Sequence, residues 1–470
     1  MSQQALGPFN EDLVKSLSGS LGEPTWLREA RLRAFQEFVS LPLERNPLYT
    51  KYAQISGFDL SQFAMGPERS VPDFRSFFRD YLTGKEKNIL LQGNDAAVHS
   101  ELEESLSSTG VVLMPLSDAL KQHGPTLKRL FEGRLVKSEQ DRFAAFVNAF
   151  FNSGTFVHIP RGVEVRGPIR KMLLVDAPRS GIIEQVFIHA EEQSKLVMLE
   201  ELYSRGAKAP SLVASSVEIV AEPGSSVDFS SIQLLDEQAI HVSNRAIAAS
   251  NDSRVTVSSL SLGASVSRSR MNFMLNGRGS LAEGFEIFFT DLTQRYDFES
   301  NLFHNSPDST GSTQARGILK GESQSIFKGM IKIVNAAKNS RSYLAHHAMI
   351  LDRTARSDAI PGLEIENNEV KATHSASVAQ IDEEQLFYLM ARGLPLDEAK
   401  RMVALGFFEP VLSRVPIEQT REVARFMIDG KWNGEKRRLV DREALLALTG
   451  ESIPEAKESE DIFERHYKYR

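Results

Sequence analysis

Histidine and carboxylate side chains are the groups in this sequence that could hold a metal ion, because its 470 residues include no cysteine. The absence of thiols excludes disulfides, thiolate nucleophiles and CxxC metal sites. Ten histidines are spread widely along the chain, and only His346 and His347 are adjacent. Neighbouring residues of a strand point to opposite faces, so we expect one of this pair to be packed and the other exposed.

His374 stands out by its position at the end of a strand-like run that begins near Ser357. A helix is predicted soon after it, with Asp382 as the N-cap and Gln385 three residues later, a variant of the capping box. An imidazole at such a junction is a suitable iron ligand. Taken alone, however, a histidine between Thr373 and Ser375 is most often a hydrogen-bonded surface residue, so both readings stay open here.

The elements that would position His374 are strands. From about residue 155 to 378, short runs of β-branched and apolar residues are punctuated by Gly, Ser and Asn, which is typical of strands and turns. No long helical pattern interrupts them, which argues against a parallel βαβ architecture. Similar turns recur at Gly224-Ser225, Asp252-Ser253 and Gly279-Ser280. Their spacing of about 25 to 30 residues suits one turn of a parallel β-helix, although a sandwich or barrel remains an alternative.

Helical patterns flank this β region, which divides the chain into three expected domains at residues 1–154, 155–378 and 379–470. In the first domain, helices are predicted from Pro24 to about Leu41 and over 140–151. In the third, glycines and a proline mark helix boundaries over 383–392, from 396 to before Gly406, from Pro416 to Gly430, and over 441–448. This pattern places Phe407 and Phe408 between the second and third of these helices.

Composition and motifs exclude several classes of function. The net charge of −7 gives no global basic surface for nucleic acid, and no run of 18 apolar residues could span a membrane. The N-terminus lacks a basic flank followed by an apolar block, so we expect a cytoplasmic protein. No phosphate loop, GxSxG elbow, HExxH helix or GxGxxG fingerprint occurs, so no enzyme activity is predicted. A carbohydrate-active β-helix enzyme stays a minor alternative, although such enzymes usually carry a secretion signal.

The C-terminal motifs resemble those of the SufB/SufD family, the scaffold subunits of the SUF iron–sulfur cluster assembly system. The resemblance rests on Ser357-Asp358-Ala359-Ile360-Pro361-Gly362-Leu363-Glu364-Ile365, on the segment up to His374, and on Asp382 to Gly393. A Trp-Leu-Arg-Glu start at Trp26 also matches the family. The resemblance implies a right-handed parallel β-helix core with helical domains at both ends. It also implies a non-catalytic scaffold that pairs with a SufB-like subunit and docks a SufC-like ABC ATPase.

Within that family the chain is most similar to SufD. Where the SufB pattern has a cysteine and a glutamate, this sequence has Ser357 and Ser375; the histidine of the SufD pattern is present as His374, although the residues around it differ. The resemblance implies that His374 is a metal or cluster ligand at the interface with the SufB-like partner. Without cysteine the isolated chain is expected to hold no cluster, so a transient cluster would depend on the partner's thiolates. A SufB-like homo-oligomeric scaffold is the alternative, and a homodimer in isolation stays open.

The C-terminal helices carry more apolar residues than the end of one β-helix would need for cover. Met and Phe on a helix suit adaptable docking to a partner groove. The resemblance implies that the ATPase contact lies in this region, so Met402, Phe407 and Phe408 are predicted to contact the ATPase. The alternative is that these helices only cap the β-helix and pack on one another.

Overall fold

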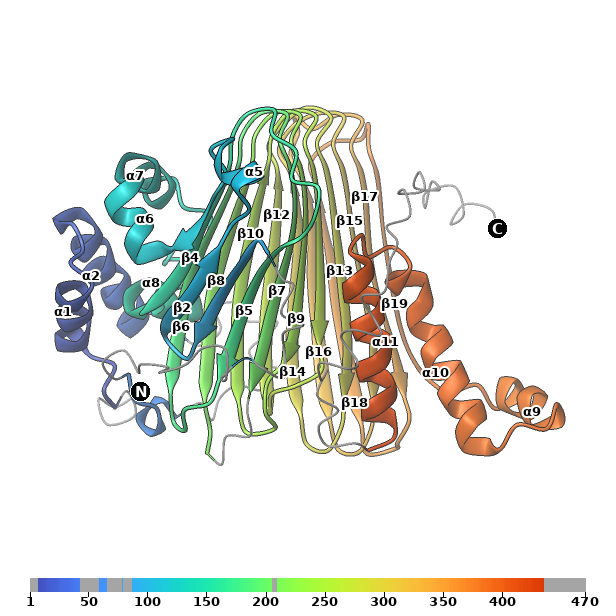
Figure 1. Cartoon of the computed structure of the whole chain (residues 1–470). Helices are drawn as coiled ribbons and strands as arrows, with labels where there is room; N and C mark the ends of the chain where they lie inside the picture. The colour runs from blue at the N-terminus through green and yellow to red at the C-terminus, as the bar shows by residue number, and fades with distance from the viewer. Residues whose placement is uncertain (1–6, 43–58, 66–77, 79–86, 205–208, 435–470) are drawn as a thin grey trace.

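The computed structural model describes residues 7–42, 59–65, 78, 87–204 and 209–434 (Figure 1). The predicted helix over 441–448 and His466 lie outside these residues. The N-terminal helical elements are α1 (Glu11–Ser20), α2 (Thr25–Ser40), η2 (Leu60–Gln62), α5 (Glu104–Ser107), α6 (Leu116–Gln122), α7 (Gly124–Glu132) and α8 (Arg142–Phe150). The C-terminal helices are α9 (Glu383–Ala391), α10 (Leu396–Leu412) and α11 (Glu418–Trp432).

Two sheets form the centre of the molecule. The 10-stranded sheet has the order β19-β17-β15-β13-β11-β9-β7-β5-β1-β2, and the 9-stranded sheet has the order β18-β16-β14-β12-β10-β8-β6-β4-β3. The first strands are β1 (Ile89–Gly93), β2 (Ala96–Glu101), β3 (Val112–Pro115), β4 (Ser153–Ile159), β5 (Ile169–Val175), β6 (Gly181–Ala190), β7 (Lys195–Ser204), β8 (Leu212–Ala221), β9 (Ser226–Leu234) and β10 (Ile240–Ala249). The remaining strands are β11 (Arg254–Ser261), β12 (Val266–Leu275), β13 (Leu281–Thr290), β14 (Arg295–His304), β15 (Thr310–Leu319), β16 (Gln324–Ile333), β17 (Arg341–Ile350), β18 (Arg356–Ile365) and β19 (Lys371–Gln380).

From β4 onward, consecutive strands alternate between the two sheets, and each strand pairs in parallel with the strand two further along the chain. The result is a parallel β-helix in which one coil consists of one strand from each sheet (Figure 1). This confirms the β-helix and excludes the sandwich and the barrel. The strands β1, β2 and β3 fall within residues 1–154, where a separate domain was expected, and they extend the two sheets at their N-terminal ends.

The turns along one edge of the β-helix repeat a single local structure. A residue in the left-handed region precedes a buried serine whose hydroxyl donates to the carbonyl oxygen three residues earlier, as Ser225 Oγ does to Glu222 at 2.7 Å. Glycine, Asn and Asp tolerate this backbone best, and these types occupy the left-handed positions Gly224, Asp252, Gly279, Asp308 and Asn339, with Gln193 as an exception. The recurring Gly-Ser and Asp-Ser pairs in the sequence are therefore the turns of successive coils.

Helices α1, α2 and α8 cover the outer face of the 9-stranded sheet at its N-terminal end (Figure 1). Arg31 of α2 is fully buried there, and its guanidinium donates to Glu23 at 2.6 and 2.7 Å and to the Ala149 carbonyl of α8 at 3.0 Å. The same group lies 3.3 Å from the centre of the Phe151 ring. A buried charge with all these partners fixes α2 against α8 in one arrangement.

Helices α10 and α11 lie against the outer face of the 10-stranded sheet. Phe408, Val411 and Val423 join a buried cluster with the sheet residues Phe285 and Ile287. Polar contacts add to this packing: Arg414 pairs with Glu283, Arg316 with the Phe407 carbonyl, and Lys431 with the Leu262 carbonyl. The helices therefore cover the side of the β-helix and leave its C-terminal end uncovered.

Helix α10 differs from its predicted course. The sequence predicts an end before Gly406, whereas the helix continues through Gly406 and Pro410 to Leu412. Proline removes one helical hydrogen bond and glycine weakens the helix, but the apolar residues of this segment are buried against the sheet. Tertiary packing therefore outweighs the local helix-breaking signals. None of the helices in the described residues combines the length and apolarity needed to cross a membrane.

Candidate functional site at the open end of the β-helix

The last coil of the β-helix exposes residues that are buried in every earlier coil. Leu363 and Ile365 of β18 are 40% and 42% exposed, although their ladder partners Ile331 and Ile333 in β16 are fully buried. No further strand follows β18 or β19 in the part of the chain that the structure describes. The end therefore presents an apolar surface together with the free hydrogen-bonding edges of two strands, which is a template for a partner.

His374 lies on this open end. It pairs in register with Leu344 of β17, whose side chain is buried in the core of the β-helix. Paired residues of a parallel ladder point to the same face. The imidazole therefore continues an interior column of the β-helix beyond its last covered coil, and it is exposed. An exposed imidazole above an apolar core can meet a ligand that a second molecule brings to this end.

The residues around His374 fit this picture. Ala372 and Ala376 continue the columns of Ser342 and His346, so small side chains flank the imidazole on its own face. Ser357, at the position of the cysteine in the SufB pattern, is buried, and its hydroxyl lies 2.8 Å from that of Ser325.

The adjacent histidines behave as the strand pattern predicts. His346 is buried and stacks on Phe327, with 4.8 Å between ring centres, and burial lowers its pKa to about 3. His347 points to the other face, is partly exposed, and has its Nδ1 atom 2.6 Å from Ser377 Oγ. The expectation of one packed and one exposed side chain is thus confirmed.

A row of charged side chains inside the β-helix was not found from the sequence. Lys171 is buried and donates to Glu184 at 2.8 Å and to Glu200 at 3.1 Å. The ladder that contains Lys171 and Glu200 continues through two serines to Glu286. Burial raises the pKa of Glu286 to about 8, more than the nearby Arg245 lowers it. These residues lie in strands that are buried on both faces, so the polar and apolar residues do not alternate. The sequence pattern therefore did not indicate which charged side chains point into the β-helix.

The three predicted docking residues fall in different environments along α10. Met402 is 51% exposed, Phe407 is partly buried, and Phe408 is fully buried in the cluster against the sheet. Phe408 therefore packs the helix onto the β-helix and is not available at the surface. Further exposed apolar side chains lie on α9, where Phe387 is 74% and Tyr388 56% exposed. In Figure 1, α9 and the start of α10 extend away from the β-helix.

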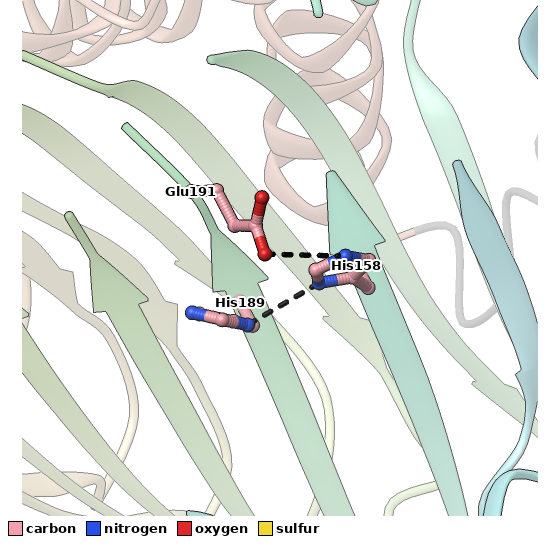
Figure 2. A group of neighbouring side chains, drawn as sticks. All are labelled: His158, His189 and Glu191. Atoms are coloured by element: carbon pink, nitrogen blue, oxygen red, sulfur yellow. Dashed lines mark hydrogen bonds and ion pairs between the residues drawn. The ribbon is translucent and has the colours of Figure 1, made fainter. Parts of the chain in front are cut away.

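The structure also brings together two histidines that are far apart in the sequence. His158 of β4 and His189 of β6 are ladder partners, and their Nδ1 atoms are 3.2 Å apart (Figure 2). Glu191 completes a group whose potential ligand atoms all lie within 4.8 Å of one another. The wide spread of the histidines along the sequence gave no indication of this contact. The separation of His158 and His189 in sequence equals one coil, which the repeat of the turns could have revealed.

Comparison with known proteins gives consistent matches along the chain. The family model of the "SUF system FeS cluster assembly, SufBD core domain" matches residues 173–407, half of the chain, and that of the "SufBD protein N-terminal region" matches residues 22–170. The chain is 26% identical to the iron–sulfur cluster assembly protein SufD of Bacillus subtilis (strain 168), over 90% of this chain and 98% of the relative. It is also 26% identical to an iron–sulfur cluster assembly SufBD family protein of Staphylococcus aureus (strain MRSA252), over 89% of this chain and 92% of the relative.

Proposed function

Because this chain belongs to the SufBD family of SUF iron–sulfur cluster assembly proteins, we propose that it is a SufD-like, non-catalytic scaffold subunit. In this role it pairs with a SufB-like subunit and docks a SufC-like ABC ATPase. The observation that carries the proposal is the uncovered C-terminal coil of the β-helix, with His374 on it. Family membership leaves the carbohydrate-active alternative without support. The absence of cysteine disfavours a SufB-like homo-oligomer that holds cluster alone.

The open end suits a partner of the same architecture. A second β-helix could cover Leu363, Ile365 and Val378 and pair with the free edge of β18 or β19. Burial of such apolar side chains contributes roughly 25 cal/mol for each square ångström removed from water. A homodimer through the same surface is the outcome to expect when the SufB-like partner is missing, since exposed edges and apolar patches favour association.

His374 would supply an imidazole ligand to an iron–sulfur cluster that forms transiently at this interface. The cluster is the cargo of the complex, and its thiolate ligands would come from the partner, because this chain has none. Neutral imidazole is an accepted ligand for iron. The interface would place His374 between two apolar ends, where exclusion of water strengthens metal–ligand interactions.

The ATPase would bind the exposed apolar side chains of α9 and the start of α10. These residues project from the β-helix and are clustered in sequence: Phe387, Tyr388, Met390, Leu396 and Met402. Met and aromatic side chains on helices are typical of adaptable docking surfaces. The buried half of α10 and α11 would transmit movement of the ATPase to the 10-stranded sheet, since these elements pack directly on it.

Replacement of His374 by Ala tests the interface role. Because the side chain is exposed, the free energy of unfolding should change by no more than about 0.5 kcal/mol. The yield of the complex should stay within experimental error of the wild-type yield. Cluster formation by the complete complex, followed by absorbance and by activation of an apo-protein, should fall sharply. His347→Ala, on the adjacent strand but facing the other way, is the matched control and should keep normal cluster formation. Normal maturation by the His374→Ala complex would disprove the assignment.

A further inference from the structure

The group formed by His158, His189 and Glu191 is drawn in Figure 2. Val157, Ile159, Ile188 and Ala190 lie in the core of the β-helix, so the alternating His158 and His189 point to the outer face of the 9-stranded sheet. His158 is partly buried and His189 is buried. The site is separated from β18 by seven ladder steps along β4-β6-β8-β10-β12-β14-β16-β18. At about 4.8 Å for each step this is roughly 33 Å, so the group is distinct from the open end and from His374.

The carboxylate of Glu222 orients His189 within this group. Glu222 Oε1 lies 2.8 Å from His189 Nε2, so a neutral His189 donates its Nε2 proton to Glu222 and keeps a lone pair on Nδ1. This Nδ1 atom lies 3.2 Å from His158 Nδ1. A carboxylate that holds the far nitrogen of a histidine is the arrangement that orients histidine ligands in metal sites.

Glu191 is oriented in the same way by the backbone. Its Oε2 atom accepts the Arg161 N–H at 2.9 Å, while its Oε1 atom faces His158 at 3.7 Å from Nε2. The side chain is 36% exposed, so it has room to close on an ion. Burial and the neighbouring His189 lower the pKa of His158.

The spacing of these atoms suits a tetrahedral ion. Two nitrogens bound at about 2.0 to 2.1 Å to one tetrahedral metal lie roughly 3.3 Å apart, close to the 3.2 Å between the two Nδ1 atoms. Two imidazoles and a carboxylate favour borderline divalent ions such as Zn²⁺, Co²⁺ and Fe²⁺ over Mg²⁺ and Ca²⁺, which prefer oxygen ligands. Glu191 and Glu222 also bring two carboxylates to the group, and their negative charge favours a bound cation.

We propose that His158, His189 and Glu191 form a binding site for a divalent first-row transition-metal ion, with Glu222 as the residue that positions His189. The site provides three protein ligands and leaves the fourth tetrahedral position to solvent or to an incoming ligand. It goes beyond the proposed scaffold role, and it would give the chain a metal site of its own that needs neither thiolates nor the partner subunit.

Titration of the untagged, chelator-treated full-length chain with Co²⁺ tests the site. We expect a visible d–d absorbance that saturates at one ion per chain, is lost when Zn²⁺ is added, and is unaffected by a large excess of Mg²⁺. Bound Zn²⁺ should also raise the thermal midpoint, because an ion that binds only the folded state stabilises it. The absence of a saturable Co²⁺ signal would overturn the proposal.

Variants place the ion on these residues. His158→Gln and His189→Gln should each abolish the one-to-one signal, and Glu222→Gln should weaken binding by about 10- to 100-fold, as loss of a supporting carboxylate does. His123→Gln is the matched control: His123 is also partly exposed and lies against Phe156, two residues before His158, and this variant should bind as the wild type does. If His189→Gln fails to fold by circular dichroism, the more exposed His158 carries the test. Unchanged Co²⁺ affinity in His158→Gln would refute the site. Unchanged Co²⁺ binding in His374→Ala would show that the metal site is distinct from the proposed interface at His374.

Discussion

At the scale of single residues, the β-helix combines an exposed imidazole, His374, at its open end with charged side chains such as Lys171 in its interior. His374 was found because its motif is local, and the structure places its imidazole on the open end. Lys171, Glu184 and Glu200 gave no such signal, because their partners lie on other strands 13 and 29 residues away. From sequence alone, a charged residue in a strand is assigned to the solvent-facing side. Only the register of the neighbouring coils shows that its side chain points inward.

Glu286 makes a prediction about pH dependence. Its pKa of about 8 in the folded chain exceeds the ordinary value of 4.5, so the folded state binds the proton more tightly than the unfolded state does. The stability that this provides is complete below about pH 4.5 and is lost as the pH rises to about 8. Glu286→Gln should therefore become more stable relative to the wild type across this range, by at most about 1.4 kcal/mol per pH unit.

Urea unfolding of both proteins at several pH values between 5 and 8 measures this difference. The exposed Glu322→Gln is the control, and its stability should follow that of the wild type at every pH. Unfolding curves of the wild type and Glu286→Gln that shift in parallel with pH would show that Glu286 is not the group that titrates.

At the scale of elements, repeat spacing and capping signals predicted the fold well, whereas the placement of helices depended on tertiary contacts. The N-cap at Asp382, which accepts from Glu384 at 2.9 Å, and the left-handed Gly393 after α9 are as predicted. The position of α10 could not be predicted, because its course through Gly406 and Pro410 is decided by the apolar sheet face beneath it. The sequence shows that such a helix is amphipathic, but not which surface it covers.

The two ends of the C-terminal helical region should respond differently to the same substitution. Phe387→Asp alters a side chain that is 74% exposed, so it should leave the thermal midpoint nearly unchanged and weaken binding of the ATPase at least tenfold. Phe408→Asp places an unpaired charge in the buried cluster, so it should destabilise the chain by several kcal/mol. Calorimetry and a pull-down with the ATPase separate the two effects. If a folded Phe387→Asp variant binds the ATPase as tightly as the wild type does, the docking surface does not include Phe387.

At the scale of the whole molecule, helices cover an outer face of each sheet, whereas the C-terminal end of the β-helix has no cover among the described residues. The recurrence of turns left a β-helix and a sandwich or barrel open, the family resemblance implied the β-helix, and the structure shows it. The resemblance implied a partner interface on this molecule, and capping of the β-helix by the C-terminal helices was the alternative. Whether an end is covered depends on where the helices pack, and that is set by contacts between residues such as Arg414 and Glu283, 131 positions apart.

Anaerobic reconstitution of the isolated chain with iron and sulfide tests its dependence on the partner. Without cysteine it should acquire no acid-labile sulfide and no sulfide-to-iron charge-transfer absorbance. Iron bound at His158 and His189 would appear without sulfide, so the ratio of the two elements distinguishes a mononuclear ion from a cluster. A brown protein with near-stoichiometric iron and sulfide would contradict the SufD-like role.

The first coils are covered by helices and the last coil is not, and this difference bears on the order in which the coils fold during synthesis. A ribosome releases the N-terminal helices and β4 first, and at about 5 to 20 residues per second each later coil emerges over a few seconds. Every new strand can then add to a ladder that is already formed, as in other folds where each repeat contacts only its neighbours. The adhesive end is made last, so nascent chains expose it only when the rest of the β-helix is complete. Growth in this order shortens the period in which an unfinished sheet edge could capture a neighbouring chain.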